Sequence, residues 1–464
     1  MMKKLRLVAL ALVVLIVLAG LAQRLIGQRP RPMPDGAAAV DAAAREILAA
    51  KCNDCHDHTR PVPFYGNLPV MGELVRKDIR DGVRHFDIAD KSHLGPDATA
   101  EEKAADPVPF ALMNKLRHTL ADGSMPPIQY KLMHWGSALN DSEKAILDAW
   151  VRDVQGAWLA QWGITEGIGA DVHPIPDALP HHPIKAAVGE RLYNDKRLSK
   201  DNTISCATCH VIEKGGTDNL PFSVGVGGLK GGVNAPTVLN AVFHMRQFWD
   251  GRAAHLAAQA GGPPLNPVEM ASANWEEIIA KLEPDLALRA MFLAVYPEGY
   301  SEATICDAIA EFEKRLITPN SRFDKYLKGD KGALTAHELR GYELFTANRC
   351  AACHAGPAMG GLSFEYADLK GDYFAGRALT DGDAGLAAFS KNPKDNKRFK
   401  VPTLRNVALT APYMHDASKA RLAAAVASML TYQVGKKKPR DEEVQSITLF
   451  LKTLNGELFG TLLK

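Results

Sequence analysis

Three short motifs in this chain carry residues with an obvious chemical use. In each, two cysteines are separated by two residues and followed directly by a histidine. The motifs are Cys52–Cys55–His56, Cys206–Cys209–His210 and Cys350–Cys353–His354. In this pattern the thiols add to the vinyl groups of a haem and the histidine binds the iron. Zinc sites and redox dithiols do not need a histidine after every pair. The sequence therefore predicts three covalently bound c-type haems.

The second axial ligand of each iron decides what that haem does. A methionine or histidine there gives an electron-transfer centre, whereas an open position lets a small molecule bind. For the first haem we favour Met125, because the two prolines that follow it hold the chain extended and suit a ligand presented from a loop. The other candidates near the first motif are Met71, His85, Met113 and Met133, and those near the third are Met359, Met414 and Met429.

Helical patterns precede all three motifs, at residues 41–50, 185–195 and 338–348. Thr335 and Glu338 have the spacing of a capping box at the start of the last one. Two more helices are expected at 141–154 and 442–456, and alternating strand patterns are scarce. Cys306, the seventh cysteine, falls in an apolar helical stripe and is expected to have no chemical role. The predicted fold is mainly α.

The histidines of the three motifs are 154 and 144 residues apart, which suggests one haem domain for each motif. Clusters of proline and glycine at 29–36, 173–183 and 327–335 mark boundaries. We expect three cytochrome c-like domains in series after an N-terminal membrane segment. The expected ranges are 1–28 for that segment, 35–165 for the N-terminal haem-binding domain, 175–330 for the second haem domain and 331–464 for the third.

The N-terminus has the features of a membrane-targeting segment. Lys3, Lys4 and Arg6 precede an uncharged, mostly apolar stretch at 7–22. This stretch is short for a spanning helix, which needs about 20 residues. We expect either an anchor or a signal cleaved near "AGLAQ", and an exported body in both cases. With 55 basic and 53 acidic residues, the chain has no charge bias that would suggest nucleic acid as a partner.

From about residue 180 to 454 the sequence resembles the bacterial di-haem cytochrome c peroxidases. The matching stretches are "RLSKDNTISCATCH", "GGTDNLPFSVG", "NAPTVLNAVF", "QFWDGRA", "QAGGPPLNPVEM", "AIAEFEKRLITPNSRFDKYLKGD", "VPTLRNVALTAPYMHD" and "AVASMLTYQVG". The N-terminal part, with "CNDCHDHTRPVPFYGNLP" and "MPPIQYKLMHW", resembles the extra haem domain of the membrane-anchored three-haem quinol peroxidases.

The resemblance implies roles for individual residues. The haem on Cys206 and Cys209 would be peroxidatic, with His210 as its proximal ligand. Glu269 matches the family's catalytic acid/base, Gln259 its partner in the distal pocket and Trp249 the aromatic residue between two haems. From composition alone, Glu269 would be a solvated carboxylate and Trp249 a core residue.

For the third motif, the resemblance implies an electron-transferring haem with His354 proximal and Met429 as the second axial ligand. It also implies a calcium ion bound by the Asn234 side chain and by the backbone carbonyls of Thr410 and Pro412. Oxygen donors of this kind suit a hard cation, with water completing the shell.

One position departs from the family pattern. Many di-haem peroxidases have a histidine in the glycine-rich loop that caps the resting peroxidatic iron, and this chain has Val226 there. Valine has no lone pair to offer a metal. The nearest candidate ligands further along the chain are His244, Met245 and His255. We expect an iron that is open, or held only by water, in every redox state.

The expected function is reduction of hydrogen peroxide to water, with electrons relayed from membrane quinol through the two other haems. A soluble cytochrome c or cupredoxin is the alternative donor, and a multihaem electron conduit is the non-enzymatic alternative. Relatives that oxidise a protein-bound tryptophan carry tyrosine at the position of Met429. The expected location is the periplasmic side of the bacterial inner membrane, anchored or released by cleavage, and a homodimer is one possible assembly.

Overall fold

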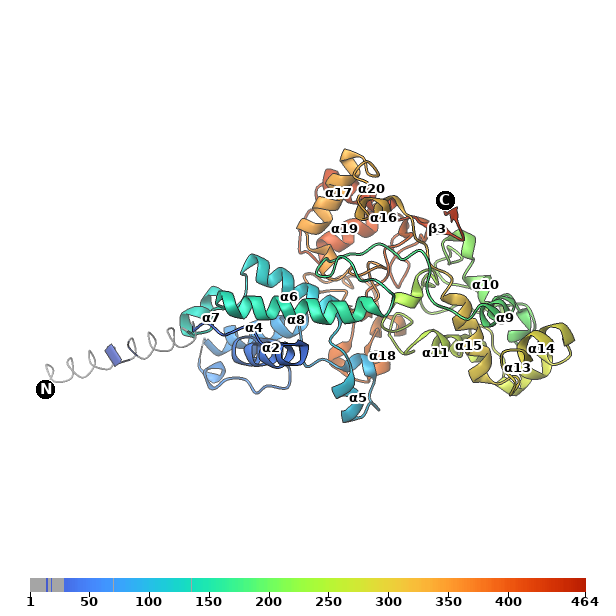
Figure 1. Ribbon diagram of the computed structural model, residues 1–464, viewed down its shortest axis with the longest axis horizontal. Helices are drawn as coiled ribbons and strands as arrows, with labels where there is room; N and C mark the ends of the chain where they lie inside the picture. The colour runs from blue at the N-terminus through green and yellow to red at the C-terminus, as the bar shows by residue number, and fades with distance from the viewer. Residues whose placement is uncertain (1–13, 16–17, 19–28, 70, 135) are drawn as a thin grey trace. The chain divides into compact units, whose positions relative to one another are not determined.

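The computed structural model describes residues 14, 15, 18, 29–69, 71–134 and 136–464. Helices connected by long loops dominate this part of the chain (Figure 1), and its sheets are two antiparallel pairs of short strands. The mainly α fold is therefore confirmed. The segment predicted to reach the membrane, residues 1–28, lies almost wholly outside the described residues. Among the helices that are described, none has the length and apolar character needed to cross a membrane.

The chain divides into two compact units. Unit 1 comprises residues 1–90 and 112–158, and unit 2 comprises residues 91–111 and 159–464. The expected N-terminal domain at 35–165 thus differs from unit 1 at residues 91–111, which pack with unit 2. The expected boundary between residues 330 and 331 does not divide unit 2. The second and third haem motifs therefore belong to the same compact unit.

Unit 1 is helical and contains the first haem motif. Its elements are α2 (Ala37–Lys51), α3 (Asn53–His56), η1 (Phe64–Asn67), α4 (Met71–His85), most of α6 (Phe110–Asp122), α7 (Ile128–Met133) and most of α8 (Asp141–Ala160). The indole N–H of Trp150, on α8, donates to Asp41 on α2 across 2.7 Å. The ammonium of Lys51 pairs with Glu143 at 2.6 Å, and both side chains are buried. These contacts fix α2, which leads directly into the haem motif.

The first part of unit 2 carries the second haem motif on α10 (Cys206–Cys209). Its other elements are η2 (Ser92–Leu94), α5 (Ala100–Ala105), α9 (Pro183–Tyr193), η3 (Lys196–Leu198), η4 (Ile212–Lys214), η5 (Val226–Gly228), η6 (Ala241–Phe243), α11 (Leu256–Ala260), α12 (Gly262–Leu265), α13 (Trp275–Leu282), α14 (Leu286–Leu293), α15 (Glu302–Glu313) and α16 (Arg322–Leu327). Cys306 is buried on α15, as expected for a helical core residue.

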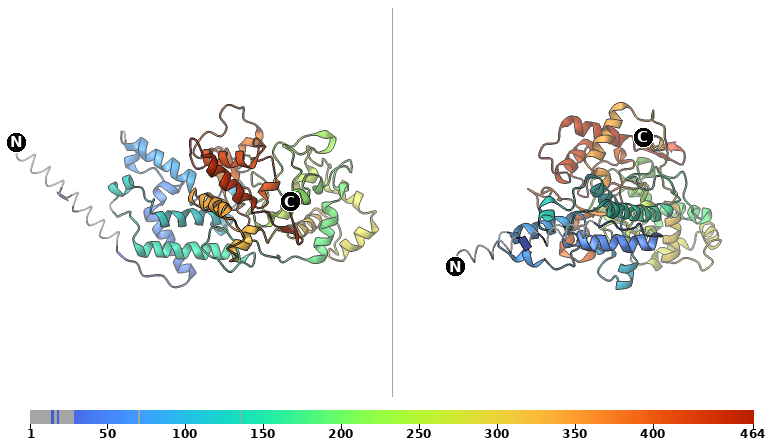
Figure 2. Two further views of the ribbon diagram at one scale, coloured as in Figure 1. Left: turned by 90° about the horizontal axis from the view of Figure 1, so that it is seen from above. Right: turned by 60° about the vertical axis from the view of Figure 1, so that its left-hand side comes forward.

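The C-terminal part of unit 2 carries the third haem motif, which begins at η7 (Cys350–Ala352). The remaining elements are α17 (Ala336–Ala347), β1 (Phe364–Tyr366), η8 (Asp381–Ala384), α18 (Ala387–Ser390), η9 (Pro393–Asp395), β2 (Arg398–Lys400), η10 (Val407–Leu409), α19 (Leu422–Tyr432), α20 (Asp441–Lys452), β3 (Glu457–Leu458) and β4 (Thr461–Leu462). The predicted capping box of Thr335 and Glu338 is present at the start of α17. In both views of Figure 2 this orange-to-red part lies beside the green-to-yellow part of unit 2.

The helix before each haem motif of unit 2 packs closely on a later helix. A Cβ added to Gly189 on α9 would lie 1.8 Å from the Ala308 carbonyl oxygen on α15. A Cβ added to Gly341 on α17 would likewise lie 2.0 Å from the Ser446 carbonyl oxygen on α20. Only glycine allows such close contact between backbones. The same packing thus positions both haem motifs of unit 2.

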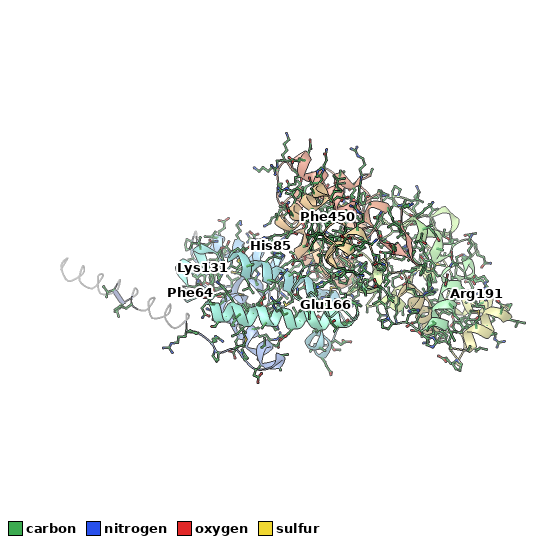
Figure 3. All side chains as sticks on the ribbon, turned by 45° about the horizontal axis from the view of Figure 1, so that its top comes forward. Phe64, His85, Lys131, Glu166, Arg191 and Phe450 are labelled. Carbon is green, nitrogen blue, oxygen red and sulfur yellow. The ribbon has the colours of Figure 1, made fainter. Side chains whose placement is uncertain are left out.

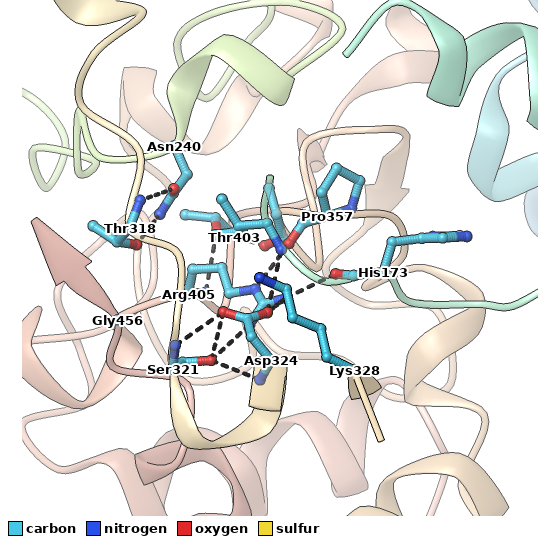
Figure 4. A network of polar contacts seen from close by, with 12 residues as sticks. His173, Asn240, Thr318, Ser321, Asp324, Lys328, Pro357, Thr403, Arg405 and Gly456 are labelled. Carbon is cyan, nitrogen blue, oxygen red and sulfur yellow. Dashed lines mark hydrogen bonds and ion pairs between the residues drawn. The ribbon is translucent and has the colours of Figure 1, made fainter. Parts of the chain in front are cut away.

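A buried ion pair fixes the loops of the C-terminal part (Figure 4). Arg405 and Asp324 are both fully buried and lie 2.8 Å apart. The Arg405 guanidinium also donates to the carbonyl oxygens of His173 and Pro357, at 2.9 and 2.8 Å. The N–H of Ile175 donates to Asp324 across 3.2 Å. One charged pair therefore holds the segment at 173–175 against the loop that follows the third haem motif.

Candidate haem sites and active site

The histidines of the three motifs are oriented in the same way. In each ring, Nδ1 is hydrogen-bonded to a backbone carbonyl oxygen. The partners are Phe86 for His56 (2.8 Å), Gly216 for His210 (3.3 Å) and Met359 for His354 (3.2 Å). A proton on Nδ1 leaves the lone pair on Nε2, which is what iron ligation requires.

Burial keeps these histidines neutral and the motif thiols protonated. It lowers the pKa of His210, and that of His354 to about 4. It raises the pKa of Cys206 and of Cys350 to about 12. All six motif cysteines are free of disulfides. Zinc binds thiolates, whereas addition to a haem vinyl group gives an uncharged thioether, so these residues fit c-type haem.

The glycine-rich loop after the second motif is bonded directly to Glu269. The backbone N–H of Val226 donates to the Glu269 carbonyl oxygen across 2.8 Å. A Cβ added to Gly225 would lie 2.4 Å from the carbonyl oxygens of Glu269 and Val268. Glycine at 225 thus permits the close approach. The loop at Val226, which has no metal ligand, therefore packs directly against the predicted acid/base Glu269. The two residues are 43 positions apart in the chain.

The Glu269 carboxyl lies in a site that favours its protonated form. Burial raises its pKa, and this effect outweighs the nearby Arg252 charge and the hydrogen bond from Asn266. The Asn266 amide donates to Oε1 of Glu269 across 2.7 Å. The Glu269 charge in turn contributes to the raised pKa of Cys209. This places the carboxylate close to the second haem-attachment site, and its raised pKa favours retention of a proton, as a general acid requires.

Two family models match this chain. One, described as di-haem cytochrome c peroxidase, matches residues 183–332, and the other, described as a haem-binding domain, matches residues 20–153. The cytochrome c peroxidase Ccp of Escherichia coli strain K12 is 47% identical over 407 residues, covering 87% of this chain and 85% of that protein. The chain belongs to the di-haem cytochrome c peroxidase family. It is therefore a haem-containing peroxidase, as expected.

Other relatives match a smaller share of this chain. The cytochrome c551 peroxidase of Nitrosomonas europaea is 43% identical, over 65% of this chain and 89% of that protein. The crystal structure of a MauG-like protein associated with microbial copper homeostasis is 31% identical, with a TM-score of 0.53, and covers 61% of this chain and 92% of that one. These two matches thus cover about two-thirds or less of this chain and most of each relative.

In this di-haem peroxidase, the two histidines that follow the glycine-rich loop have other contacts. His255 is exposed and caps α11, where its ring accepts the N–H of Ala258 across 3.2 Å. His244 packs against Gly361 and Lys400, in the part of unit 2 that carries the third motif. Gln259 is half-buried on α11. These contacts support the expectation that no histidine takes the place of Val226.

Trp249 belongs to an aromatic cluster with Phe399 and His415, two residues that follow the third motif in the chain. Its ring meets those of Phe399 and His415 edge-on, at 6.4 and 6.3 Å between centroids. Phe399 and His415 stack on each other at 4.1 Å. The indole N–H donates to the Asn234 carbonyl oxygen across 2.8 Å. This arrangement suits the role between two haems that the resemblance implies for Trp249.

The predicted methionine ligands differ in their surroundings. Met429 is half-buried on α19. The competing Met359 is fully buried, and its carbonyl oxygen is bonded to the proximal His354. In unit 1, Met125 is 40% exposed, whereas Met113 on α6 is fully buried. Met429 and Met125 therefore stay predictions as second axial ligands, because none of these contacts tests that role.

The predicted calcium ligands lie on segments that contact each other. The N–H of Asn234 donates to the His415 carbonyl oxygen across 2.8 Å. The Asn234 amide donates to the carbonyl oxygens of Leu220 and Pro221, which leaves its Oδ1 atom available. Asn219 donates to the carbonyl oxygens of Leu409 and Ala411. The carbonyls of Thr410 and Pro412, which alternate with these, accept no hydrogen bond in the described part of the chain.

Two residues that the sequence analysis missed support the site. Asn266 holds the Glu269 side chain, and its own Oδ1 accepts the N–H of Val268 across 3.1 Å. An asparagine before proline often forms such a turn, so the "NPVE" stretch contained a usable signal. Lys400 had no comparable signal, because only the tertiary structure shows that it is buried beside His244.

Proposed function

We propose that this peroxidase reduces hydrogen peroxide at the haem held by Cys206, Cys209 and His210. The observation that carries the proposal is the bond between Val226 and Glu269. It joins a loop with no metal ligand to a buried carboxylate near the haem-attachment site. The iron of a bound haem supplies the site for peroxide and accepts electrons. The reaction is H₂O₂ + 2e⁻ + 2H⁺ → 2H₂O.

Glu269 is the proposed proton carrier. Peroxide must lose a proton from the oxygen that binds iron and gain one on the oxygen that leaves, and one carboxylate within reach can do both. Its raised pKa favours the protonated form, which can supply a proton to the oxygen that leaves. Asn266 orients the carboxylate, and Gln259 is the proposed second polar group of the pocket. Trp249 and its aromatic neighbours are the proposed route from the third haem, with Met429 as that haem's second ligand.

The proposed electron source is membrane quinol. Its electrons would enter the protein at the first haem, whose proposed second axial ligand is Met125. Unit 1 carries exposed apolar side chains near this motif, including Phe64, which is 81% exposed (Figure 3), and Ile128, which is 69% exposed. Phe64 precedes Tyr65, whose ring lies 5.3 Å from that of His134. The hydroxyl of Tyr130, two residues after Ile128, donates to Asp54 inside the first motif across 2.8 Å. An apolar surface beside a haem fits a lipophilic donor better than a charged redox protein.

The donor can be tested with the full-length protein in lipid nanodiscs, a short-chain quinol and hydrogen peroxide. We expect peroxide-dependent quinol oxidation that falls in Phe64→Ser and Ile128→Ser. Turnover with a soluble artificial reductant should be unchanged in both variants. Leu286→Ser is the matched control, because Leu286 is 74% exposed in unit 2. Equal quinol rates in all three variants would argue for a soluble donor.

We also propose that the body lies on the periplasmic side of the inner membrane and that a calcium ion binds at Asn234, Thr410 and Pro412. The oxygens left without hydrogen bonds at these residues support the calcium site. Chelation of calcium should lower peroxidase activity, and added calcium should restore it. A chelator without effect on activity or on bound calcium would contradict this site.

A further inference from the structure

Lys400 and His244 form a buried pair of basic side chains in unit 2. Lys400, at the end of β2, is 5% exposed, and its Nζ atom lies 3.1 Å from Nδ1 of His244. The two residues are 156 positions apart in the chain. The pair therefore joins the segment after η6 to the strand that follows the third haem motif.

The backbone fixes both residues. The N–H of Met245 donates to the Gly361 carbonyl oxygen across 2.9 Å, and the N–H of Lys400 donates to the Trp249 carbonyl oxygen across 2.9 Å. A Cβ added to Gly361 would lie 2.1 Å from Cδ2 of His244. The His244 ring thus packs closely against the glycine, in space that any larger residue at 361 would fill.

The polypeptide supplies no anion for this pair. No carboxylate of a described residue lies within ion-pair distance of the Lys400 ammonium, whose one side-chain partner is the His244 ring. Burial lowers the pKa of Lys400 to about 7, and that of His244 falls well below its ordinary value. Nε2 of His244 is buried without any hydrogen-bond partner. Basic groups buried in this way are strongly disfavoured unless something pairs with them.

The residues around Lys400 and His244 indicate which anion would pair with them. Two residues after Lys400, the Pro402 carbonyl supports the proximal His354 of the third motif. The Lys400 N–H is bonded to the backbone of Trp249, whose ring contacts Phe399 and His415. A haem brings two propionate carboxylates, and these are the anions expected next to a haem-binding segment.

We propose that Lys400 and His244 bind a propionate of a haem held in unit 2, with the haem of His354 as the first candidate and that of His210 as the second. The proposal rests on c-type haem binding and goes beyond the peroxidase reaction. Lys400 would donate to the carboxylate as a cation. Nδ1 of His244 faces the Lys400 ammonium and accepts from it, so the proton of the ring is on Nε2, which would donate to the same carboxylate. A cation beside a haem stabilises its reduced form, so the pair would raise the reduction potential of that haem.

The test is a spectroelectrochemical titration of each haem in the full-length holoprotein. Lys400→Met should lower the reduction potential of one haem and shift the propionate bending modes in its resonance Raman spectrum. Lys400→Arg keeps the charge and should shift the potential less. Lys394→Met is the control, because it removes an exposed lysine from the same part of the chain and should change neither readout. The haem whose potential moves identifies the source of the propionate.

The proposal is wrong if Lys400→Met retains all three potentials and the Raman spectrum of the unchanged protein. If Lys400→Met loses haem, His244→Phe is the second test, since it leaves Lys400 in place and removes the Nε2 atom of His244. A changed propionate mode in His244→Phe supports the site, and an unchanged one overturns it. These readouts do not depend on turnover, so they separate this proposal from the proposed peroxidase mechanism.

Discussion

The backbone N–H of Val226 donates to the carbonyl oxygen of Glu269 across 2.8 Å. The residue that stands where many family members have a capping histidine is thus bonded to the proposed acid/base. Without that histidine, the glycine-rich loop has no residue to bind the iron, and its backbone supports Glu269 instead. The proposed open iron site and the proposed proton carrier therefore depend on the same few backbone contacts.

The first prediction concerns Gly225. In Gly225→Ala the new methyl group would clash with the carbonyl oxygens of Glu269 and Val268, so the loop or Glu269 must move. A displacement of about 1 Å can cost about 10²-fold in rate, and we expect a fall of that order in kcat for peroxide with haem content unchanged. Gly232→Ala is the control, because nothing lies within 4 Å of an added Cβ there. Equal rates for both variants would contradict the supporting role of the loop.

The second prediction concerns the oxidised resting state. Because Val226 offers no lone pair, the fully oxidised protein should bind cyanide and show a high-spin ferric haem in its EPR spectrum. Val226→His should convert that signal to low spin and stop the reaction with peroxide until the protein is reduced. Val226→Ala should behave like the unchanged protein. A fully oxidised sample that fails to bind cyanide would show that another ligand occupies the iron.

The third prediction uses the pKa of Glu269. Glu269→Gln should lower peroxidase turnover by about 10²- to 10⁴-fold. Asn266→Ala removes a hydrogen bond that lowers the pKa of Glu269, so this pKa should rise further. A carboxyl with a higher pKa keeps its proton up to a higher pH, so the acidic limb of the kcat/KM profile should move upward. An acidic limb at the same pH in both proteins would exclude Glu269 as the titrating group.

The fourth prediction concerns stability. Asp324→Asn leaves the fully buried Arg405 without its charged partner, and such a loss typically costs about 3–5 kcal/mol. Chemical denaturation of the holoprotein measures the change in the free energy of unfolding. Asp177→Asn is the control, because its ion pair with Lys328 is exposed and should be worth less than about 1 kcal/mol. Similar values for the two variants would show that Arg405 finds other partners.

The sequence by itself determined the haem chemistry of this protein, because covalent attachment needs two thiols and a histidine at fixed local spacing. It also predicted the helix that precedes each motif, since apolar periodicity and capping residues act within a few turns. The family assignment rested on local stretches in the same way, as in the "NPVEM" segment that contains Glu269.

Only the tertiary structure decided how distant segments combine. The domain boundary expected at residues 330 and 331 does not divide unit 2. Residues on its two sides contact each other, as where Arg405 pairs with Asp324 and donates to the His173 carbonyl oxygen. The bond from Val226 to Glu269 and the burial of Lys400 beside His244 arise in the same way. Whether a charged side chain is buried or paired depends on which segments lie next to each other in the folded protein. No local pattern in the sequence predicts those contacts.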